Sequence, residues 1–243
     1  MLQTEVPGPA WLVLPTYNEA GNIEPFVEAV LAKLPDSARV LIVDDNSPDG
    51  TGEIADRLAQ GEERVAVLHR PHKEGLGPAY LAGFDRALAG GAGLVLEMDS
   101  DFSHDPAYLP RLLEAGGKAD LVIGSRYVPG GGVGNWSLPR RLISRGGSAY
   151  ARLVLGLRVN DLTGGFKCFR REVLEAIDLR SIRSRGYAFQ VEMTYRAIQH
   201  GFEVVEVPIV FKERRAGASK MDHSIVAEAA WRVPMLRFEG KRR

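Results

Sequence analysis

The sequence predicts an α/β fold in which a mostly parallel central sheet is covered by helices on both faces. Short apolar runs of strand length alternate along the chain with longer segments whose apolar residues recur at helical spacing. The short runs do not themselves alternate with polar residues, which is typical of strands buried on both faces. A succession of this kind favours βαβ units and a parallel sheet.

The elements of the first half follow one another closely. The first strand is expected at 11–14, ending at Pro15, and the first helix at 23–34. Further strands are expected at 40–43, 65–68, 94–98 and 121–124, and further helices at 51–58, 76–88 and 106–113. Pro106 suits a helix start, because the N–H that proline lacks has no partner there.

The second half changes character after Gly124. We expect a loop at 127–135, helices at 140–157, 171–177 and 188–200, mixed turn and strand at 161–170, and extended segments at 203–207 and 209–211. A last helical pattern at 225–238 contains Pro234, which predicts a kink or a break there. The sequence shows no internal repeat, so the second half is interpreted as an elaboration of the first sheet.

The composition is that of an ordinary globular protein. The 243 residues suffice for one large domain, and 31 Lys and Arg balance 31 Asp and Glu, so no nucleic-acid partner is expected. The single Cys168 excludes an internal disulfide and a multi-cysteine zinc site. No apolar run reaches the roughly 18–20 residues that span a bilayer, and residues 1–9 lack the pattern of a signal peptide. We therefore expect a cytoplasmic protein.

The most informative motif is Asp99-Ser100-Asp101, directly after the strand at 94–98. In extended backbone, side chains two residues apart point to the same face, so both carboxylates are expected at one spot beyond the strand. Ligands of open α/β sheets bind at the carboxyl ends of strands. Two carboxylates there suit a hard divalent cation, which in turn suits a diphosphate. A turn that simply favours Asp and Ser is the alternative.

Acidic and amide groups also follow the first two strands, in the segments 15–19 and 43–51. One such cluster can be a helix cap, and Asp49 or Thr51 could cap the next helix. Three clusters at one sheet edge are expected to line a common crevice. No Gly-x-Gly-x-x-Gly follows the first strand and no P-loop motif is present, which excludes a dinucleotide site and a P-loop. A carboxylate-lined site can still bind a nucleotide, with a metal bridging its phosphates.

Together with 75–80, these motifs resemble the serial motifs of the family 2 glycosyltransferases. More narrowly, the chain is similar to the dolichol-phosphate, or polyprenol-phosphate, mannose synthases, through the segments 124–128, 135–137, 161–166 and 211–220. The similarity implies a GT-A fold with a Rossmann-like half for a nucleotide sugar and a second half for an acceptor. It also implies a tail at 1–9, a catalytic domain at 10–220, and a C-terminal amphipathic helix with a basic tail at 221–243.

The resemblance implies a role for each matching residue. The nucleotide sugar would be held by Pro15, Tyr17, Glu19, Asp44, Asp45, Asp49, Gly77, Ser100, Gln190, Glu192, Arg214 and Lys220. Asp99 and Asp101 would bind Mg²⁺ or Mn²⁺ at the diphosphate, with Ser103 standing where the family often has Gln as a ligand. The acceptor phosphate would be held by Arg126, Arg140 and Ser144, and catalysis would depend on Asp99, Asp101 and Arg126.

Three of these roles have simpler alternatives. Arg126 could be a solvated loop charge, Arg140 could belong to a polar helix start, and Glu192 could be an exposed helical residue. Arginine nevertheless suits the implied chemistry, because it binds phosphate through two nitrogens and stays charged.

The reaction that the resemblance implies is inverting transfer of mannose from GDP-mannose to a polyprenyl phosphate, which gives a β-linked product. The acceptor phosphate is largely deprotonated near neutral pH, so no strong general base is required. A UDP-sugar donor, another acceptor and a non-catalytic nucleotide sensor are the alternatives.

A lipid acceptor implies a membrane surface as a partner. The segments 142–157 and 225–238 combine apolar residues with basic neighbours, a pattern that binds anionic interfaces. We expect peripheral attachment at the cytoplasmic face of the membrane, directly or through a separate membrane partner protein. Ordinary core packing of both segments is the alternative.

Overall fold

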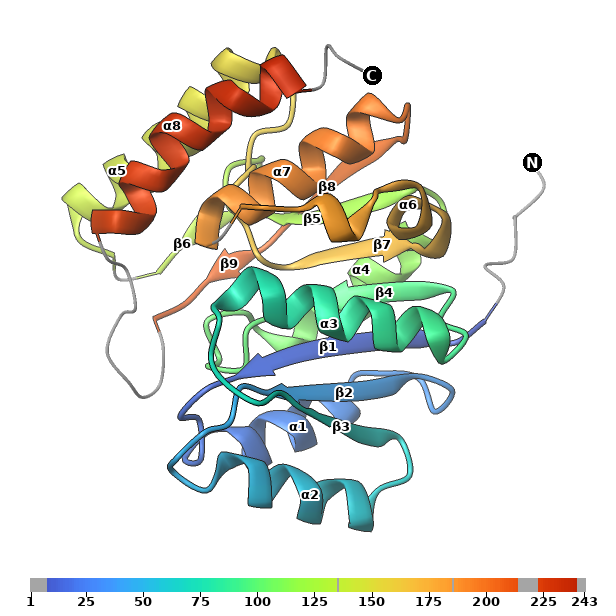
Figure 1. The fold of residues 1–243 in the computed structure, drawn as a ribbon. Coiled ribbons are helices and arrows are strands. Elements are labelled where there is room, and N and C mark those ends of the chain that lie inside the picture. Colours follow the sequence, from blue (N-terminus) through green and yellow to red (C-terminus); the bar gives the residue numbers. More distant parts are fainter. Residues whose placement is uncertain (1–7, 135, 185, 214–222, 240–243) are drawn as a thin grey trace.

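The computed structural model describes residues 8–134, 136–184, 186–213 and 223–239. Within these ranges the main sheet has seven strands in the order β3-β2-β1-β4-β7-β5-β8 (Figure 1). The strands are β1 (Ala10–Thr16), β2 (Arg39–Asp44), β3 (Val65–His69), β4 (Leu94–Glu97), β5 (Leu121–Ser125), β7 (Lys167–Arg170) and β8 (Val204–Pro208). All neighbours pair in parallel except β7, which is antiparallel to β4 and β5. The predicted mostly parallel sheet is confirmed.

Helices cover both faces of this sheet. They are α1 (Ile23–Leu31), α2 (Thr51–Gly61), α3 (Leu76–Ala89), α4 (Leu109–Gly116), α5 (Leu138–Leu155), α6 (Arg171–Ala176), α7 (Gly186–Gln199) and α8 (His223–Glu239), with short 3-10 turns at Pro106–Tyr108 and Leu179–Ser181. Leu12 and Leu14 of β1 point into the core beneath α1, α2 and α4, whereas Trp11 and Val13 point into the core beneath α3 and α7. Successive residues of each uninterrupted apolar run thus pack into the two cores on opposite faces of the sheet.

Two details of the second half differ from the expectation. The segment expected to be only loop contains a two-residue strand, β6 (Gly132–Val133), which pairs in parallel with β9 (Val210–Phe211). The last helix continues through Pro234 instead of breaking there. Val233 and Leu236 lie on either side of Pro234 and are buried in the core, and this packing offsets the hydrogen bond that proline removes.

The helices α5 and α8 lie side by side at one end of the molecule, beside α7 (Figure 1). Hydrogen bonds tie α5 to α8: the Tyr150 hydroxyl donates to the carbonyl of Ala230 (2.6 Å), and Arg237 donates to the carbonyl of Val154 (2.6 Å). In the part of the chain that the structure describes, no helix has the length and apolar character needed to cross a bilayer.

Candidate active site

The carboxyl ends of β1, β2 and β4 lie at the same edge of the sheet, because the three strands are parallel neighbours. The loops after β1 and β2 are joined by hydrogen bonds from backbone to side chain. The amide of Glu19 donates to Thr51 Oγ1 (2.9 Å), and the amide of Ala20 donates to Asp49 Oδ2 (3.1 Å). The polar segments 15–19 and 43–51, which follow β1 and β2, are therefore held together by hydrogen bonds.

Asp44 and Asp49 are the main acceptors in this structure. Asp44 is buried and accepts from the hydroxyl of Ser47 at Oδ1 (2.5 Å) and from its amide at Oδ2 (3.2 Å), and His69 Nδ1 lies 3.8 Å from Oδ2. Asp49 accepts from the amide (3.1 Å) and the hydroxyl (2.5 Å) of Thr51, the first residue of α2, whose N-cap residue is Gly50. Although burial acts in the opposite direction, hydrogen bonds from Thr51 and from the Ala20 amide lower the pKa of Asp49.

The loop after β3 adds two cations that sequence reasoning missed. Arg70 is buried and donates to Asp45 Oδ1 (2.5 Å) and to Glu74. Burial raises the pKa of Asp45 despite this guanidinium. The Lys73 ammonium lies 3.9 Å from the centre of the Tyr17 ring, at cation–π distance. The signal available in the sequence was the position of Arg70 directly after a strand, equivalent to the positions that carry the acidic motifs.

The Asp99-Ser100-Asp101 motif follows β4 at the centre of this edge. The Ser100 hydroxyl donates to the carbonyl of Pro15 (3.2 Å), which fixes the motif against the end of β1. Asp101 is buried, whereas Asp99 is partly exposed and accepts from the Tyr80 hydroxyl at Oδ1 (3.3 Å). Burial, together with the charges of Asp99 and its acidic neighbours, raises the pKa of Tyr80 well above its usual value, so the phenol is a neutral donor.

The donor atoms here fit a hard divalent cation. Asp101 Oδ1 accepts from the amide of Ser103 (2.9 Å), and Ser103 Oγ is buried with no hydrogen-bond partner in the described ranges. Two carboxylates and this hydroxyl offer oxygen ligands only, as Mg²⁺ and Mn²⁺ prefer. In the described residues, no three or more His, Cys, Asp or Glu side chains lie close enough together to hold a metal ion. A bound cation would therefore take its remaining ligands from substrate oxygens and water.

A buried ion pair lies beneath the motif. Lys167 of β7 and Glu97 of β4 have no exposed surface, and Lys167 Nζ is 3.5 Å from Glu97 Oε1. Lys167 also donates to the carbonyl (3.0 Å) and the side-chain oxygen of Gln190. Burial raises the pKa of Glu97 and lowers the pKa of Lys167, while their mutual attraction opposes both shifts. Gln190 is thus a partner of this pair, and its contact with a nucleotide sugar stays a prediction.

Glu192 lies at the junction of α7 and α8. It is fully buried, and its carboxylate binds Arg196 (2.5 Å), the Ser184 hydroxyl and Arg232 of α8 (3.6 Å). The alternative of an exposed helical residue is therefore wrong. Two arginines stabilise the negative charge of Glu192 in the interior. A sugar contact for Glu192 stays a prediction.

Arg126 is likewise not a solvated loop charge. It donates to both oxygens of Asp161, from Nε (2.7 Å) and Nη2 (2.6 Å), and from Nη2 to Thr163 Oγ1 (2.9 Å), and it is buried. Although burial acts to lower it, the Asp161 carboxylate raises the pKa of Arg126. The sequence pattern did not predict that Asp161 binds this arginine. The feature that could have indicated it is that Asp161 is the single acidic residue of the segment 161–166.

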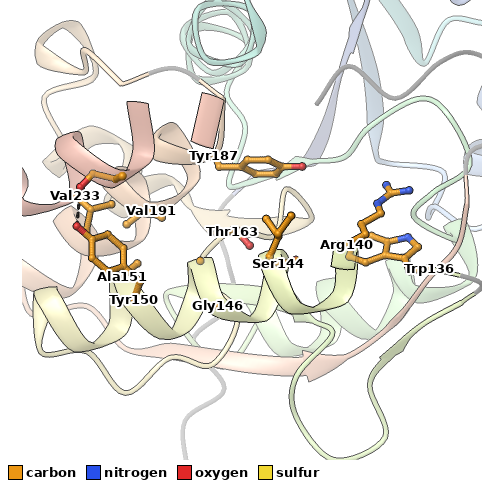
Figure 2. A pocket seen from close by; sticks show the side chains of 13 residues that line it. Trp136, Arg140, Ser144, Gly146, Tyr150, Ala151, Thr163, Tyr187, Val191 and Val233 are labelled. Atoms are coloured by element: carbon orange, nitrogen blue, oxygen red, sulfur yellow. Dashed lines mark hydrogen bonds between the residues drawn. The ribbon is translucent and has the colours of Figure 1, made fainter. Parts of the chain in front are cut away.

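A cavity of about 460 Å³ opens between α5, α7 and α8 (Figure 2). It is lined by Trp136, Arg140, Ile143, Ser144, Gly146, Gly147, Tyr150, Ala151, Thr163, Tyr187, Val191, Ala230 and Val233. Arg140 and Trp136 lie at one end, with the guanidinium 4.2 Å from the indole centre, and Tyr150 and Val233 lie at the other. The cavity is therefore apolar along most of its length and cationic at one end.

Two of the predicted acceptor residues lie in this cavity. Arg140 Nε is buried and has no hydrogen-bond partner among the described residues, and Arg140 Nη1 is 3.9 Å from Glu213. Ser144 Oγ, one helical turn on, accepts from the Tyr127 hydroxyl (2.6 Å). Arg126 does not line the cavity itself; it contacts two residues that do, donating to Thr163 and lying 5.8 Å from the centre of the Trp136 ring. The predicted Arg214 and Lys220 lie outside the described residues.

The comparisons with known proteins agree with this arrangement. The family model of glycosyl transferase family 2 matches residues 11–178. The chain belongs to this family. It is 50% identical over 232 residues to the polyprenol monophosphomannose synthase of Mycolicibacterium smegmatis, covering 95% of this chain and 87% of the relative. It is also 50% identical over 234 residues to the undecaprenyl-phosphate mannosyltransferase of Micrococcus luteus, covering 95% of this chain and 96% of the relative.

Solved structures extend the likeness to the fold. Glucosyl-3-phosphoglycerate synthase from Mycobacterium tuberculosis, in complex with Mn²⁺, uridine diphosphate and glucosyl-3-phosphoglycerate, superposes with a TM-score of 0.67 at 19% identity, covering 99% of this chain and 84% of that one. The predicted GT-A fold is confirmed. The family 2 transferase therefore combines a cluster of polar side chains at the carboxyl ends of β1, β2 and β4 with a largely apolar cavity between α5, α7 and α8.

Proposed function

We propose that this protein transfers mannose from GDP-mannose to a polyprenyl phosphate, with inversion, to give a β-linked polyprenyl-phosphate mannose. The observation that carries the proposal is the cavity between α5, α7 and α8. A lipid phosphate has a charged head and an apolar chain, and this cavity has a cation at one end and apolar walls along the rest. The names of the two relatives support mannose as the transferred sugar and a polyprenyl phosphate as the acceptor.

The head of the acceptor would lie at the start of α5. Arg140 belongs to the first turn of this helix, and its buried Nε lacks a partner in the described part of the protein. The amino end of a helix also attracts anions, because its backbone N–H groups are unpaired and the helix dipole is positive there. Ser144 and Thr163 add hydroxyl groups to the same wall. These groups can hold a phosphate while the chain lies toward Tyr150.

In this reaction the protein has to position the two substrates and to neutralise the negative charge of the leaving diphosphate. A phosphate oxygen of the acceptor attacks the anomeric carbon of the sugar, and the bond from that carbon to the nucleoside diphosphate breaks. A divalent cation, when bound by Asp99, Asp101 and Ser103, would neutralise charge that develops on the leaving diphosphate. Arg140 holds the attacking anion in place, and the loops that contain Tyr17, Glu19 and Asp44 would hold the nucleoside. Such preorganised charge is the main source of catalysis proposed here.

Membrane attachment is part of the proposal. The outer faces of α5 and α8 expose large apolar side chains, namely Leu138, Leu142, Leu153, Trp231 and Phe238. Arg141, Arg145 and Arg152 are exposed on α5 as well. Apolar residues flanked by arginine suit an anionic membrane surface, which here would be the cytoplasmic one. The cavity opens between the same helices, so a lipid could pass from the membrane into the site, with or without a membrane partner protein.

The substitution Arg140→Gln tests the acceptor site. Arg111→Gln is the control, since Arg111 is an exposed arginine of α4 that is not among the residues lining the cavity. Losing a charge-assisted hydrogen bond costs about 1.5–3 kcal/mol, so Arg140→Gln should raise the KM for a short polyprenyl phosphate roughly 10-fold or more. The affinity for GDP, measured by calorimetry, should stay unchanged in both variants. An equal KM in the two variants would refute the acceptor site.

A further inference from the structure

Tyr80 is a buried residue of α3 that touches the metal motif. Its side chain has no exposed surface, and its hydroxyl donates to Asp99 Oδ1 (3.3 Å). Asp99 is only partly buried and follows directly after the carboxyl end of β4. The phenol is therefore in contact with the more exposed of the two carboxylates, from the side of the protein interior.

The ring of Tyr80 is held between two other aromatic rings. Phe84, one turn further along α3, lies 5.8 Å from it between ring centres, at an interplanar angle of 26°. Phe189 of α7 lies 6.1 Å from it and is nearly parallel, at 2°. Stacked rings at these distances attract one another and resist rotation. The stack therefore fixes the position of the phenol oxygen relative to the end of β4.

Gly77 sets how close α3 and α7 can come. A Cβ on Gly77 would lie 3.1 Å from the Phe189 ring and 3.1 Å from the carbonyl of Ser184. Both contacts are shorter than side chains normally tolerate, and the second is with rigid backbone. Gly77 precedes Tyr80 by three residues and thus lies on the same side of α3. The missing side chain is what lets Tyr80 reach Phe189.

We infer that Tyr80 is a positioning residue for Asp99, and that Gly77 and Phe189 hold it in place. The inference rests on the proposed metal-dependent function. A carboxylate that must bind a cation through one rotamer is a better ligand when a neighbour holds that rotamer, and losing such a neighbour commonly lowers metal affinity 10–100-fold. Gly77, which the resemblance assigns to the nucleotide sugar, would then act on the donor site through Tyr80 and Asp99.

The variant Tyr80→Phe tests the inference, since it keeps the stacked ring and removes only the hydroxyl. Mn²⁺ binding would be measured in the presence of GDP, from the loss of the electron paramagnetic resonance signal of free Mn²⁺. The variant should bind Mn²⁺ about 10-fold more weakly than the wild type. In the transfer assay the Mn²⁺ concentration for half-maximal rate should rise by a similar factor, while kcat at saturating Mn²⁺ recovers.

Two further variants sharpen the test. Tyr108→Phe removes a different hydroxyl, one that accepts from the amide of Val210 (3.1 Å), and should leave Mn²⁺ binding unchanged. Phe189→Leu keeps the Tyr80 hydroxyl but loosens the stack, and should weaken Mn²⁺ binding less than Tyr80→Phe does. Unfolding temperatures in EDTA check that each variant folds.

The outcomes separate the two claims. If the wild type with GDP binds no Mn²⁺, the proposed metal-dependent function fails. If the wild type binds Mn²⁺ and Tyr80→Phe binds it equally well, the proposed function stands and the positioning role of Tyr80 is overturned.

Discussion

At the scale of single residues, the acidic side chains at the sheet edge fall into two groups. Asp44 and Asp49 accept several hydrogen bonds from their own loops, and they shape the crevice. Asp99 and Asp101 follow the central strand β4 near the Ser103 hydroxyl, which has no hydrogen-bond partner among the described residues, and we expect them to bind a ligand. The same type of side chain thus joins the loops and, in the proposed function, binds ligands at one edge of the sheet.

The ion pair of Lys167 and Glu97 gives a prediction at this scale. Removing one member leaves an uncompensated charge in the interior, so Lys167→Met should lower the free energy of unfolding by about 3–5 kcal/mol. The double variant Glu97→Leu/Lys167→Met removes both charges and should regain most of that loss. Urea unfolding of the wild type and the variants, including Glu97→Leu alone, measures the coupling. A double variant no more stable than the single ones would contradict a coupled buried pair.

The sequence predicted the residues of the crevice better than their partners. Asp99 and Asp101 were recognisable because a strand pattern directly precedes them. The partners of the buried charges were not, since Arg126 meets Asp161 and Glu97 meets Lys167 only after distant segments have folded together. Periodicity reports burial, and it carries no information on which buried charges pair across the sheet.

At the scale of elements, α8 is attached to the rest of the protein by specific polar bonds. Arg232 is buried, donates to the Ser184 hydroxyl (3.1 Å) and lies 3.6 Å from the Glu192 carboxylate. Ala230 and Val233 of the same helix line the cavity. The helix that the sequence indicated as an amphipathic appendage therefore also forms a wall of the candidate acceptor site.

Loss of the Arg232 contacts should loosen α8 selectively. Arg232→Met keeps the apolar stem and removes the charge, and it should lower the free energy of unfolding by about 1–3 kcal/mol. Hydrogen exchange should become faster in α8 before it changes in the central strands. Arg111→Met is the control, because Arg111 is exposed on α4. Equal exchange rates in α8 of both variants would show that Arg232 does not hold the helix.

Element boundaries were predictable where apolar patterns were long, and not elsewhere. All expected strands and helices of the first half are present, because each carries its own periodic signal. The pairing of β6 with β9 was missed, since two residues are too few to show a period and the pairing joins distant segments. A kink or a break at Pro234 was predicted from local rules alone; the helix does not break there, because the neighbouring residues are buried in the core.

At the scale of the whole molecule, the two substrates would be handled at different places. The crevice at β1, β2 and β4 would take a water-soluble donor, while α5, α7 and α8 would take the acceptor from a lipid surface (Figure 1). A transferase that joins such partners needs both places close together. The antiparallel β7 joins the two halves of the sheet, since it pairs with β4 on one side and with β5 on the other.

Membrane association is the prediction that belongs to this scale. Leu142 and Leu153 are 70% and 81% exposed on α5, and inserting a leucine into an interface contributes roughly 1.5–3 kcal/mol. Leu142→Ser and Leu153→Ser should each weaken binding to anionic vesicles about 10-fold or more at low salt. Leu76→Ser is the control, because Leu76 is an exposed leucine at the start of α3. Equal vesicle binding by all three variants would exclude α5 as the attachment face.

The most direct test of the central claim is transfer from a radiolabelled donor to a short polyprenyl phosphate in the presence of Mg²⁺ or Mn²⁺. GDP-mannose should yield a labelled lipid, and UDP-glucose should yield little or none. Product formation should stop in EDTA and in the variant Asp101→Asn, which removes the charge of one proposed metal ligand. Absence of transfer from GDP-mannose, preferential transfer from UDP-glucose, or full activity of Asp101→Asn would contradict the account.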